Sequence, residues 1–337
     1  MSTIFFGIDI SKDNLDAAFH DGQEVKMLGK FTNRPKGIAQ LERRLLAVIS
    51  PDDQIHLIVE PTGSYHLSLV AYAHQQGWVV SLPNPQVVRE WARGQGQRAK
   101  TDQIDARLLA SYGAKEKPSP QQPLSPEVEA LDELLHRQED LKKMLRQERN
   151  RLHSHQQRPH PTASVIDSIE TNIRSLEQAL ATVEQATQDH LKEFPHLDQQ
   201  RRLLLKVPGI GDKSVLPILV FLYRWDARTS GLGDAKGLTA FAGLDPVAHS
   251  SGTSIYKRPS ISKMGDADMR SRLFLCALGG SRAKDTPLTR FYRRLVARHK
   301  PKMVALVASA RKILVWAFAI FRSGQPFDPA LAMPKTR

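Results

Sequence analysis

Apolar segments in the first 113 residues follow an order that few folds can accommodate. Short strands are expected at residues 3–9, 15–19 and 24–31, with polar turns between them. Helices and strands then alternate, with helices at 35–49, 64–75, 85–93 and from about 101 to 113, and strands at 55–59 and 78–82. Three antiparallel strands followed by alternating helices and strands predict a single α/β sheet covered by helices.

This element order is that of the ribonuclease-H-like (RuvC-like) fold, in which the first and fourth strands lie side by side at the centre of the sheet. The first expected strand ends in Asp9, and the fourth is followed directly by Glu60. Functional sites in α/β sheets lie at the carboxyl ends of the strands. We therefore expect Asp9 and Glu60 to lie close together.

Two further acids, Asp102 and Asp105, are expected at the start of the helix that runs to about residue 113. A spacing of three places both on one face, with Cβ atoms roughly 5–6 Å apart. Taken alone, the pair suits a helix cap, with Asp102 as N-cap at the positive end of the helix dipole. Together with Asp9 and Glu60, it predicts a site for Mg²⁺ or Mn²⁺, which prefer such oxygen ligands.

The chain of 337 residues has a formal net charge of +13 and a pI near 9.9, which point to a nucleic acid partner. Residues 250–312 hold fifteen Lys and Arg against three Asp and Glu, a net charge of +12. The single cysteine, Cys276, excludes an internal disulfide, lies in an apolar run and fits a cytoplasmic protein. Residues 303–321 are apolar but interrupted by Arg311 and Lys312, so we expect a buried or amphipathic helix and no membrane partner.

Four parts follow from these patterns: a catalytic domain at 1–117, a proline-rich linker at 118–126, a helical segment at 127–198 and a mainly α-helical domain at 199–337. The helical segment has two long amphipathic stretches joined by a turn that contains Pro159 and Pro161. Such stretches form either an antiparallel hairpin or a coiled coil that joins subunits.

Two loops of the last domain have both a structural and a functional interpretation. The turn Val207-Pro208-Gly209-Ile210-Gly211 either joins two helices or approaches a phosphate beside Lys213, as in a helix-hairpin-helix module. Ser250-Ser251-Gly252-Thr253-Ser254 is either a flexible loop or a source of a nucleophilic hydroxyl, because it opens the basic segment.

Six motifs resemble those of the DEDD transposases of the insertion-sequence one-ten and eleven-eleven group, to which Piv-type DNA invertases are related. They occur in family order along nearly the whole chain: Gly7-Ile8-Asp9-Ile10-Ser11-Lys12, Val59-Glu60-Pro61-Thr62-Gly63, Lys100 to Arg107, Val207 to Gly211, Phe241-Ala242-Gly243-Leu244 and Ser251-Gly252. The resemblance implies a RuvC-like domain whose metal-binding acids are Asp9, Glu60, Asp102 and Asp105. It also implies a C-terminal transposase domain in which Ser251 is the nucleophile.

The resemblance further implies an enzyme that cuts and rejoins DNA through a covalent phosphoserine. Its partners would be target and donor DNA, an element-encoded noncoding (bridge-type) guide RNA, and further copies of the chain in a dimer or tetramer with composite active sites. Such a protein is expected in the bacterial cytoplasm, associated with the nucleoid. After Ser251-Gly252 the family commonly has further basic residues, whereas this chain has Ile255-Tyr256-Lys257-Arg258-Pro259.

Nine basic side chains near these motifs are candidates for nucleic acid binding: Arg98, Lys100, Arg107, Lys213, Lys257, Arg258, Lys263, Arg270 and Arg272. The main alternative function is a RuvC-like metal-dependent nuclease or resolvase, or a DNA invertase that acts without RNA. A sugar or acetate kinase would need a second domain of the same type, and nothing after Pro118 supplies one. A catalytically inert nucleic acid scaffold is a further alternative.

Overall fold

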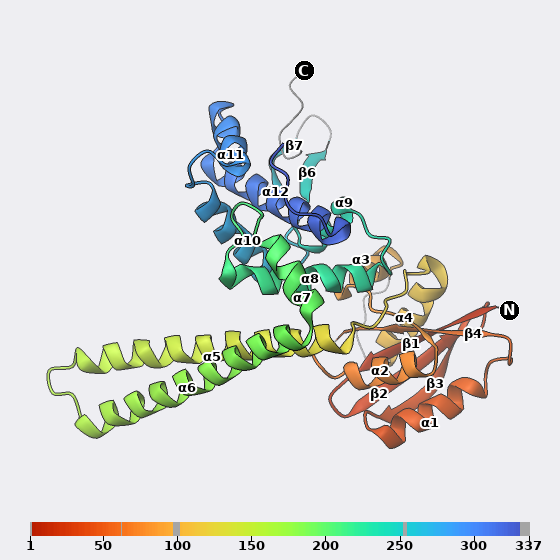
Figure 1. Cartoon of the computed structure of the whole chain (residues 1–337). Coiled ribbons are helices and arrows are strands. Elements are labelled where there is room, and N and C mark those ends of the chain that lie inside the picture. The colour runs from red at the N-terminus through yellow and green to blue at the C-terminus, as the bar shows by residue number, and fades with distance from the viewer. Residues whose placement is uncertain (1, 62, 97–101, 252–254, 331–337) are drawn as a thin grey trace. The chain divides into compact units, whose positions relative to one another are not determined.

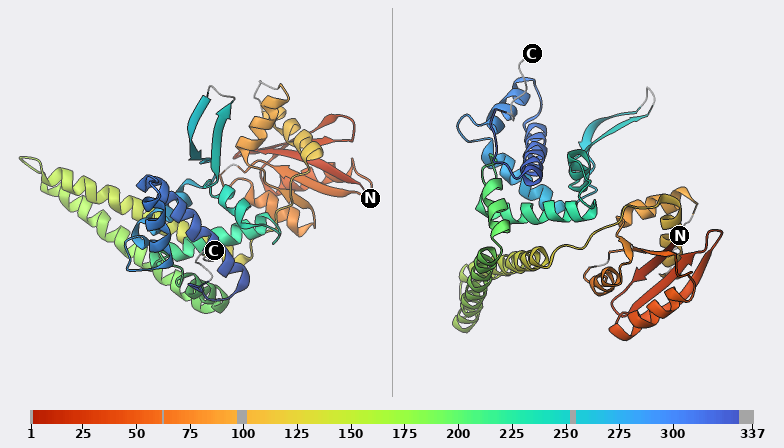
Figure 2. Two further views of the ribbon diagram at one scale, coloured as in Figure 1. Left: turned by 90° about the horizontal axis from the view of Figure 1, so that it is seen from above. Right: turned by 45° about the vertical axis from the view of Figure 1, so that its right-hand side comes forward.

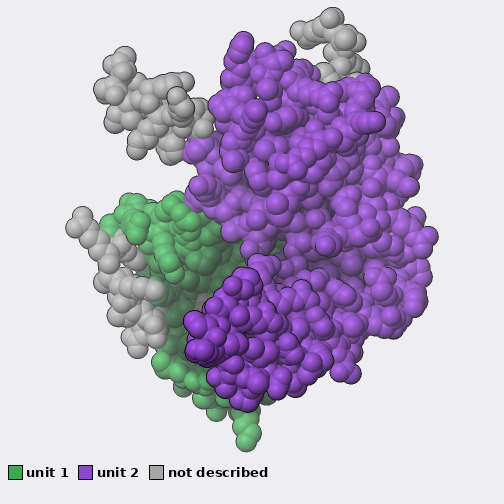
Figure 3. Space-filling view, turned by 90° about the vertical axis from the view of Figure 1, so that its left-hand side faces the viewer, with its two compact units in different colours: residues 1–123, 226–233 green, residues 124–225, 234–337 purple. Residues whose placement is uncertain are grey.

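The computed structural model describes residues 2–61, 63–96, 102–251 and 255–330, and for residues 102–104, 248–251 and 255–259 it describes the backbone without the side chains. The chain forms two compact units, coloured separately in Figure 3. Unit 1 comprises residues 1–123 and 226–233, and unit 2 comprises residues 124–225 and 234–337. The finer division predicted above, with a separate linker and helical segment, stays a prediction.

Unit 1 contains the predicted α/β sheet, with five strands in the order β3-β2-β1-β4-β5. The strands are β1 (Thr3–Ile10), β2 (Asn14–His20), β3 (Val25–Thr32), β4 (Gln54–Val59) and β5 (Val79–Ser81). β1 pairs with β2 and β2 with β3 in antiparallel fashion, whereas β1–β4 and β4–β5 are parallel. The first and fourth strands are therefore neighbours, as the element order predicts, and the arrangement is consistent with a ribonuclease-H-like fold.

Helices pack on both faces of this sheet, shown at the red and orange end of the chain in Figure 1. They are α1 (Pro35–Leu46), α2 (Leu67–Gln75), α3 (Pro85–Gly94) and α4 (Asp102–Glu116). Phe6 and Ile8 of β1 share one apolar core with α1 and α2, and Phe5 shares another with α3 and α4. Alternate residues of β1 thus face opposite helical layers, since side chains alternate along a strand.

The backbone of α4 lies directly on β1, and Gly7 permits this approach. A Cβ atom at Gly7 would lie 2.2 Å from the Ala106 carbonyl oxygen and 2.3 Å from the Ala110 amide nitrogen. Further along α4, a Cβ at Gly113 would lie 2.5 Å from the Ile58 side chain. Ala106, Ala110 and Gly113 follow the helical period, so α4 presents a face of small residues to the sheet. This contact fixes where the start of α4 lies relative to the end of β1.

A buried polar group ties the segment after α4 to the edge of the sheet. The His56 ring Nε2 lies 2.8 Å from the Ser81 hydroxyl, which lies 3.0 and 2.9 Å from the carbonyl oxygens of Pro118 and Ser119. When the hydroxyl donates to a carbonyl, Nε2 carries the hydrogen that it donates to the hydroxyl oxygen. Burial lowers the pKa of His56 to about 4. The imidazole is therefore neutral in the folded protein at neutral pH.

Unit 2 is mostly helical, as predicted for the C-terminal region, and it includes one two-stranded ribbon. Its elements are α5 (Pro126–Gln156), α6 (Ala163–Glu193), α7 (Pro195–Leu204), α8 (Asp212–Arg228, of which the last turn belongs to unit 1), α9 (Ala235–Phe241), β6 (Pro246–Ser251), β7 (Ile255–Ile261), α10 (Ala267–Gly280), α11 (Pro287–Ala297) and α12 (Lys302–Ser323). Figure 2 shows the ribbon and the helices from two further sides.

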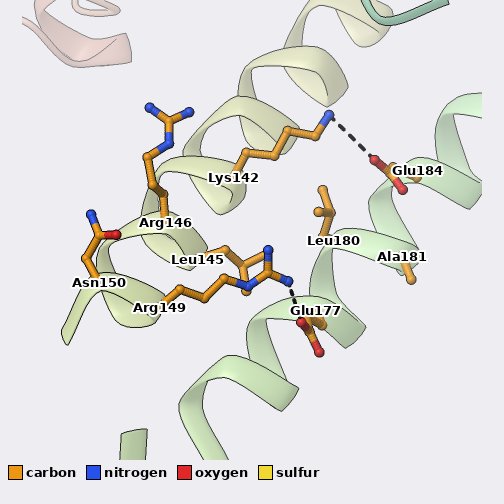
Figure 4. Close-up of a pocket in the computed structure, with 9 residues that line it drawn as sticks. All are labelled: Lys142, Leu145, Arg146, Arg149, Asn150, Glu177, Leu180, Ala181 and Glu184. Carbon is orange, nitrogen blue, oxygen red and sulfur yellow. Dashed lines mark hydrogen bonds and ion pairs between the residues drawn. The ribbon is translucent and has the colours of Figure 1, made fainter. Parts of the chain in front are cut away.

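Helices α5 and α6 form a helical hairpin joined by a short turn at residues 157–162. An apolar seam that includes Leu145 and Ile173 runs between them. Two ion pairs cross the seam, Lys142–Glu184 at 3.5 Å and Arg149–Glu177 at 2.7 Å, as Figure 4 shows. Of the two alternatives for this segment, the chain by itself thus forms the hairpin, and a coiled coil between subunits stays a proposal.

Helix α12 is long and apolar enough to cross a membrane by length and composition alone. Most of this helix is buried inside the protein, since 61% of its most apolar 18-residue stretch is buried. Ile313, Leu314 and Trp316 belong to the main core of unit 2, which also takes in α7, α8, α9 and α10. The segment therefore has the character of a buried helix, in line with the sequence-based expectation.

The Gly7→Ala variant tests whether the packing of α4 on β1 requires a residue without a side chain at position 7. The new methyl group meets backbone atoms that cannot rotate away, so Gly7→Ala should lower the free energy of unfolding by about 2 kcal/mol or more. Gly94→Ala is the matched control, because a Cβ there meets nothing within 4 Å and favours the helix. Urea denaturation measures both, and equal stability of the two variants would contradict the close approach.

The buried His56 predicts a loss of stability in mild acid. His56 of the unfolded chain binds a proton near pH 6.5, whereas His56 of the folded protein binds one only near pH 4. The contribution of the neutral imidazole to the free energy of unfolding is therefore complete above pH 6.5 and falls as the pH drops below it. We expect it to remove about 2 kcal/mol between pH 7 and 5. His56→Gln should flatten the pH dependence of the unfolding free energy over this range. An unchanged slope in the variant would rule out His56 as the titrating group.

Candidate functional site

Asp9 and Glu60 lie next to each other at the carboxyl ends of the two central parallel strands. Ile8 of β1 pairs with Val59 of β4, so the residue that follows each member of this pair is an acid. Both acids line one pocket of about 390 Å³. The pocket is lined by Asp9, Ile10, Ser11, Lys12, Glu60, Tyr65, Val88, Arg89, Asp105, Leu108 and Leu109. The expectation that Asp9 and Glu60 converge is met by the fold.

The third acid of this pocket, Asp105, comes from α4. Its neighbour Ala106 is the residue whose carbonyl contacts Gly7, and Gly7 lies two residues before Asp9 on the same face of β1. The contact between helix and strand therefore delivers Asp105 to the end of β1. Asp102 begins α4 one turn earlier, but its side chain lies outside the described part of the structure.

Cationic and polar groups surround the acids. Arg89 of α3 places Nη2 3.5 Å from Oε1 of Glu60, whose side chain is 20% exposed. Lys12 is an exposed lining residue on the loop after β1. The Asn33 side chain donates to the carbonyl oxygens of Ser11 and Tyr65, both at 3.0 Å, and so joins the loops that follow β1 and β4. The pocket thus has a fixed rim, with two cations that suit a phosphate beside the carboxylates.

The chemistry of these donors fits a hard divalent cation. Three carboxylates from separate elements, and a fourth one helical turn away in the sequence, are typical oxygen ligands for Mg²⁺ or Mn²⁺. Among the described residues, no three acidic, histidine or cysteine side chains converge closely enough to enclose a metal. The side chain of Asp102 lies outside the described part of the structure, and Arg89 lies against Glu60. Asp9, Glu60, Asp102 and Asp105 are the residues that would hold such a metal.

A further acid, Asp16, adjoins the site and was not among the sequence-based candidates. It is the direct antiparallel partner of Asp9 across β1 and β2, so both side chains leave the same face of the sheet. Asp16 is only 4% exposed, and its carboxylate lies 3.4 Å from Lys30 Nζ. The tight turn at residues 11–14 is the feature of the sequence that could have identified Asp16, because a turn there pairs residue 9 with residue 16.

The candidate nucleophile Ser251 is the last residue of β6. It pairs with Ile255 of β7, and Ser250 pairs with Tyr256, so both serines belong to the ribbon. Gly252, Thr253 and Ser254 lie outside the described residues, as do the side chains of Ser250 and Ser251. The structure thus gives the register of the backbone at this serine and no contact of its hydroxyl.

Two of the predicted nucleic-acid-binding residues are bound within unit 2. Arg270 donates from Nη1 to the carbonyl oxygens of Ala242 and Gly265, at 3.2 and 2.7 Å. Arg272 pairs with Glu139 at 3.0 Å and donates to the carbonyl oxygen of Lys213 at 2.9 Å. These bonds give both guanidinium groups a role in holding the turns of unit 2 together.

The other predicted basic residues fall into two groups. Arg107, Lys213 and Lys263 are exposed. Arg98 and Lys100 lie outside the described residues, and for Lys257 and Arg258 only the strand backbone is described. Nucleic acid binding by all of these residues stays a prediction.

The turn that contains Gly209 packs tightly against α10. Gly209 has a φ of +96°, and a Cβ there would lie 2.7 Å from the Cys276 carbonyl oxygen. Packing therefore accounts for the glycine without a phosphate. The second glycine of the turn, Gly211, is exposed and has nothing within 4 Å of its Cβ position, so the phosphate hypothesis for this turn rests on Gly211 and Lys213.

Two family models match consecutive parts of the chain. Residues 6–161 match a model of DEDD transposases of the IS110 type, described as "Transposase", and residues 201–293 match a model described as "Transposase IS116/IS110/IS902 family". The first match spans all four acids of the candidate site, and the second contains Ser251.

Known proteins resemble the chain over half of its length or more. Pilin gene-inverting proteins of Moraxella lacunata and Moraxella bovis are each 33% identical over 328 residues, which cover 97% of this chain and 98% of theirs. An uncharacterized 43.6 kDa protein of insertion element IS110 from Streptomyces coelicolor is 26% identical over 168 residues, which cover 50% of this chain and 40% of that protein. Together with the acids gathered at the central strands, these matches identify the chain as a member of the IS110 family of transposases, DNA recombination enzymes related to the pilin gene-inverting proteins.

Proposed function

We propose that the chain cuts and rejoins DNA as the transposase of an insertion sequence, with a metal-binding acidic site and a serine nucleophile. The acids are Asp9, Glu60, Asp102 and Asp105, and the nucleophile is Ser251. The observation that carries the proposal is the convergence of Asp9, Glu60 and Asp105 on one pocket beside two cations. Similarity along almost the full length of proteins named for gene inversion supports DNA as the substrate.

Divalent ions bound at these acids, Mg²⁺ or Mn²⁺, would neutralise charge on the reacting phosphate and lower the pKa of an attacking hydroxyl. The residues of the chain divide the remaining work. Lys12 and Arg89 hold phosphate oxygens at the pocket rim. Asp16 lies beside Asp9 on β2, and its ion pair with Lys30 balances its charge.

The proposed covalent step exchanges one phosphoester bond for another. The Ser251 hydroxyl loses its proton to a nearby base or solvent and attacks phosphorus, forming a phosphoserine while the bond to one sugar oxygen breaks. The leaving sugar hydroxyl takes up a proton. Attack by a sugar hydroxyl of a second strand reverses these steps and frees the serine. Because the number of phosphoester bonds is conserved, rejoining needs no energy source.

The resemblance to the family supports two further parts of the proposal. An element-encoded noncoding RNA selects target and donor DNA by base pairing, and the basic residues between 250 and 312 bind these nucleic acids. The chain acts as a dimer or tetramer in the bacterial cytoplasm at the nucleoid, with acids from one subunit and Ser251 from another in each active site. Sequencing of RNA that copurifies with the protein from its native locus tests the guide. Absence of a specific RNA would favour an invertase that acts on DNA alone.

A RuvC-like nuclease or resolvase is the second candidate, because the acidic pocket alone suffices for metal-dependent hydrolysis. The two candidates differ in Ser251. A nuclease would retain cleavage in Ser251→Ala, whereas the recombinase loses both the covalent adduct and strand transfer.

Mixing two inactive variants tests the composite site. Asp105→Asn removes a carboxylate charge from the metal site, and Ser251→Ala removes the nucleophile, so each variant alone should lose recombination by at least about a hundredfold. When the two are assembled together, one active site has intact acids and an intact serine, and recombination should return. Recombination is measured on plasmids that carry the two DNA sites.

Failure of complementation in assemblies shown to contain both variants would place the acids and the serine of each site in one subunit. Binding of Mn²⁺, followed by electron paramagnetic resonance, gives a second readout. It should weaken in Asp105→Asn and stay unchanged in Ser251→Ala. Equal binding by both variants would contradict the assignment of Asp105 as a metal ligand.

The α5–α6 hairpin carries an apolar residue that suits contact between subunits, since Met144 is 44% exposed. Met144→Glu should lower the mass of the assembly in light scattering while the melting temperature stays within a few degrees of the wild type. Val48→Glu is the matched control, because Val48 is 40% exposed and belongs to unit 1. An unchanged mass in Met144→Glu would assign assembly to another surface.

A further inference from the structure

The last helices of unit 2 contain basic residues with no acid among them. From Thr286 to Phe327 the sequence has no Asp or Glu, and it has nine Lys and Arg. These are Arg290, Arg293, Arg294, Arg298, Lys300, Lys302, Arg311, Lys312 and Arg322. Elsewhere in unit 2 many basic side chains are paired, as Arg201, Arg202 and Arg224 are with aspartates. An acid-free stretch of this length in a folded region favours an anion from outside the chain.

Packing of α11 on α12 brings three of these cations together. Leu288 of α11 and Ile313 of α12 lie in the same core, and the two helices are neighbours in Figure 1. Burial and the charges of Arg294 and Arg311 lower the pKa of Lys312. Among the described residues, none of the three forms an ion pair. Folding therefore concentrates positive charge here and leaves it uncompensated.

Two of the three cations are held by aromatic rings. Lys312 Nζ lies 5.4 Å from the centroid of the Trp316 ring, and Arg294 Cζ lies 5.4 Å from that of Phe291. Trp316 is itself buried in the core and contacts Phe327. The rings restrict where the two charges can go, so the cluster is organised before any ligand arrives.

Arg294 also has a side-chain nitrogen without a hydrogen-bond partner among the described residues. Its Nε atom is buried and has no hydrogen-bond acceptor in the described structure. Buried donors are nearly always satisfied, so such an atom requires explanation. A guanidinium group offers two parallel donors to an oxyanion, and phosphate matches that geometry. A phosphate beside the cluster would offset the repulsion between the three cations, and a rotation of the Arg294 side chain would bring Nε to a phosphate oxygen.

We propose that Arg294, Arg311 and Lys312 form a binding site for a backbone phosphate of the DNA substrate. The choice of DNA as the source of the phosphate rests on the proposed function. The cluster differs from the basic residues suggested by sequence motifs, of which Arg270 and Arg272 are engaged within unit 2. It lies on α11 and α12, outside both the acidic pocket and the serine ribbon.

Fluorescence anisotropy of the full-length protein with a short DNA duplex in EDTA tests this site without any contribution from metal. Arg294→Gln and Lys312→Met should each weaken binding by roughly threefold to tenfold and reduce the slope of log affinity against log salt by about one. Arg290→Gln is the matched control, because Arg290 lies one turn from Arg294 and is paired with Asp285. Equal losses in the control and the cluster variants would overturn the site.

Thermal stability separates binding from a structural role. Lys312→Met removes one member of a repelling cluster and keeps the volume of the side chain, so the melting temperature of the free protein should stay equal or rise. A fall in melting temperature with unchanged DNA affinity would show that Lys312 only packs. If Arg294→Gln does not fold, Arg311→Gln, at an exposed position, takes its place in the binding assay.

The last experiment repeats the binding measurement with an RNA duplex of the same sequence. Loss of affinity for DNA, with or without a similar loss for RNA, supports the site, whereas a loss confined to RNA overturns the assignment to the DNA substrate. The covalent adduct at Ser251 is a separate readout. An adduct that still forms in Lys312→Met with unchanged DNA binding would refute this site and leave the proposed function intact.

Discussion

The contact between the backbone of α4 and strand β1 at Gly7 is the constraint on which the candidate site depends. Any side chain at Gly7 would overlap the backbone of α4 at Ala106 and Ala110. The absence of a Cβ lets the helix lie on the strand and brings Asp105 to the pocket that contains Asp9. Glu60 reaches the same pocket because β4 is the parallel neighbour of β1. One steric condition and one strand order thus gather three acids that are far apart in the sequence.

Several like charges held close together repel each other and destabilise the folded protein. Carboxylates in one pocket repel each other unless cations compensate them, and here Arg89, which pairs with Glu60, supplies part of that compensation. A divalent ion would supply the rest. On α11 and α12 the clustered charges are positive, and Arg294 and Lys312 have no acid among their described partners. Acid and base clusters of this kind are the two complementary requirements of an enzyme that handles phosphodiesters.

Much of unit 1 could be predicted from the sequence because its signals are local. The strand and helix periods gave the element order, and this order implied that the strands ending in Asp9 and Glu60 are adjacent. Asp16 was missed although its signal was present, since the turn at residues 11–14 fixes its pairing with Asp9. The bond between Arg272 and Glu139 had no local signal, because the two residues are distant in sequence and meet only through tertiary packing. The same holds for the bond of Arg270 to Ala242, whereas its bond to Gly265 is local.

In the proposed reaction, DNA becomes covalently attached to Ser251 under the control of the acidic pocket. The most direct measurement is mass spectrometry of peptides after reaction with a DNA substrate whose release step is blocked. A nucleotide on the peptide that contains Ser251, present in the wild type and absent in Asp105→Asn, is the predicted result. Cleaved DNA with a free Ser251 peptide would contradict the account and indicate hydrolysis by the acids alone.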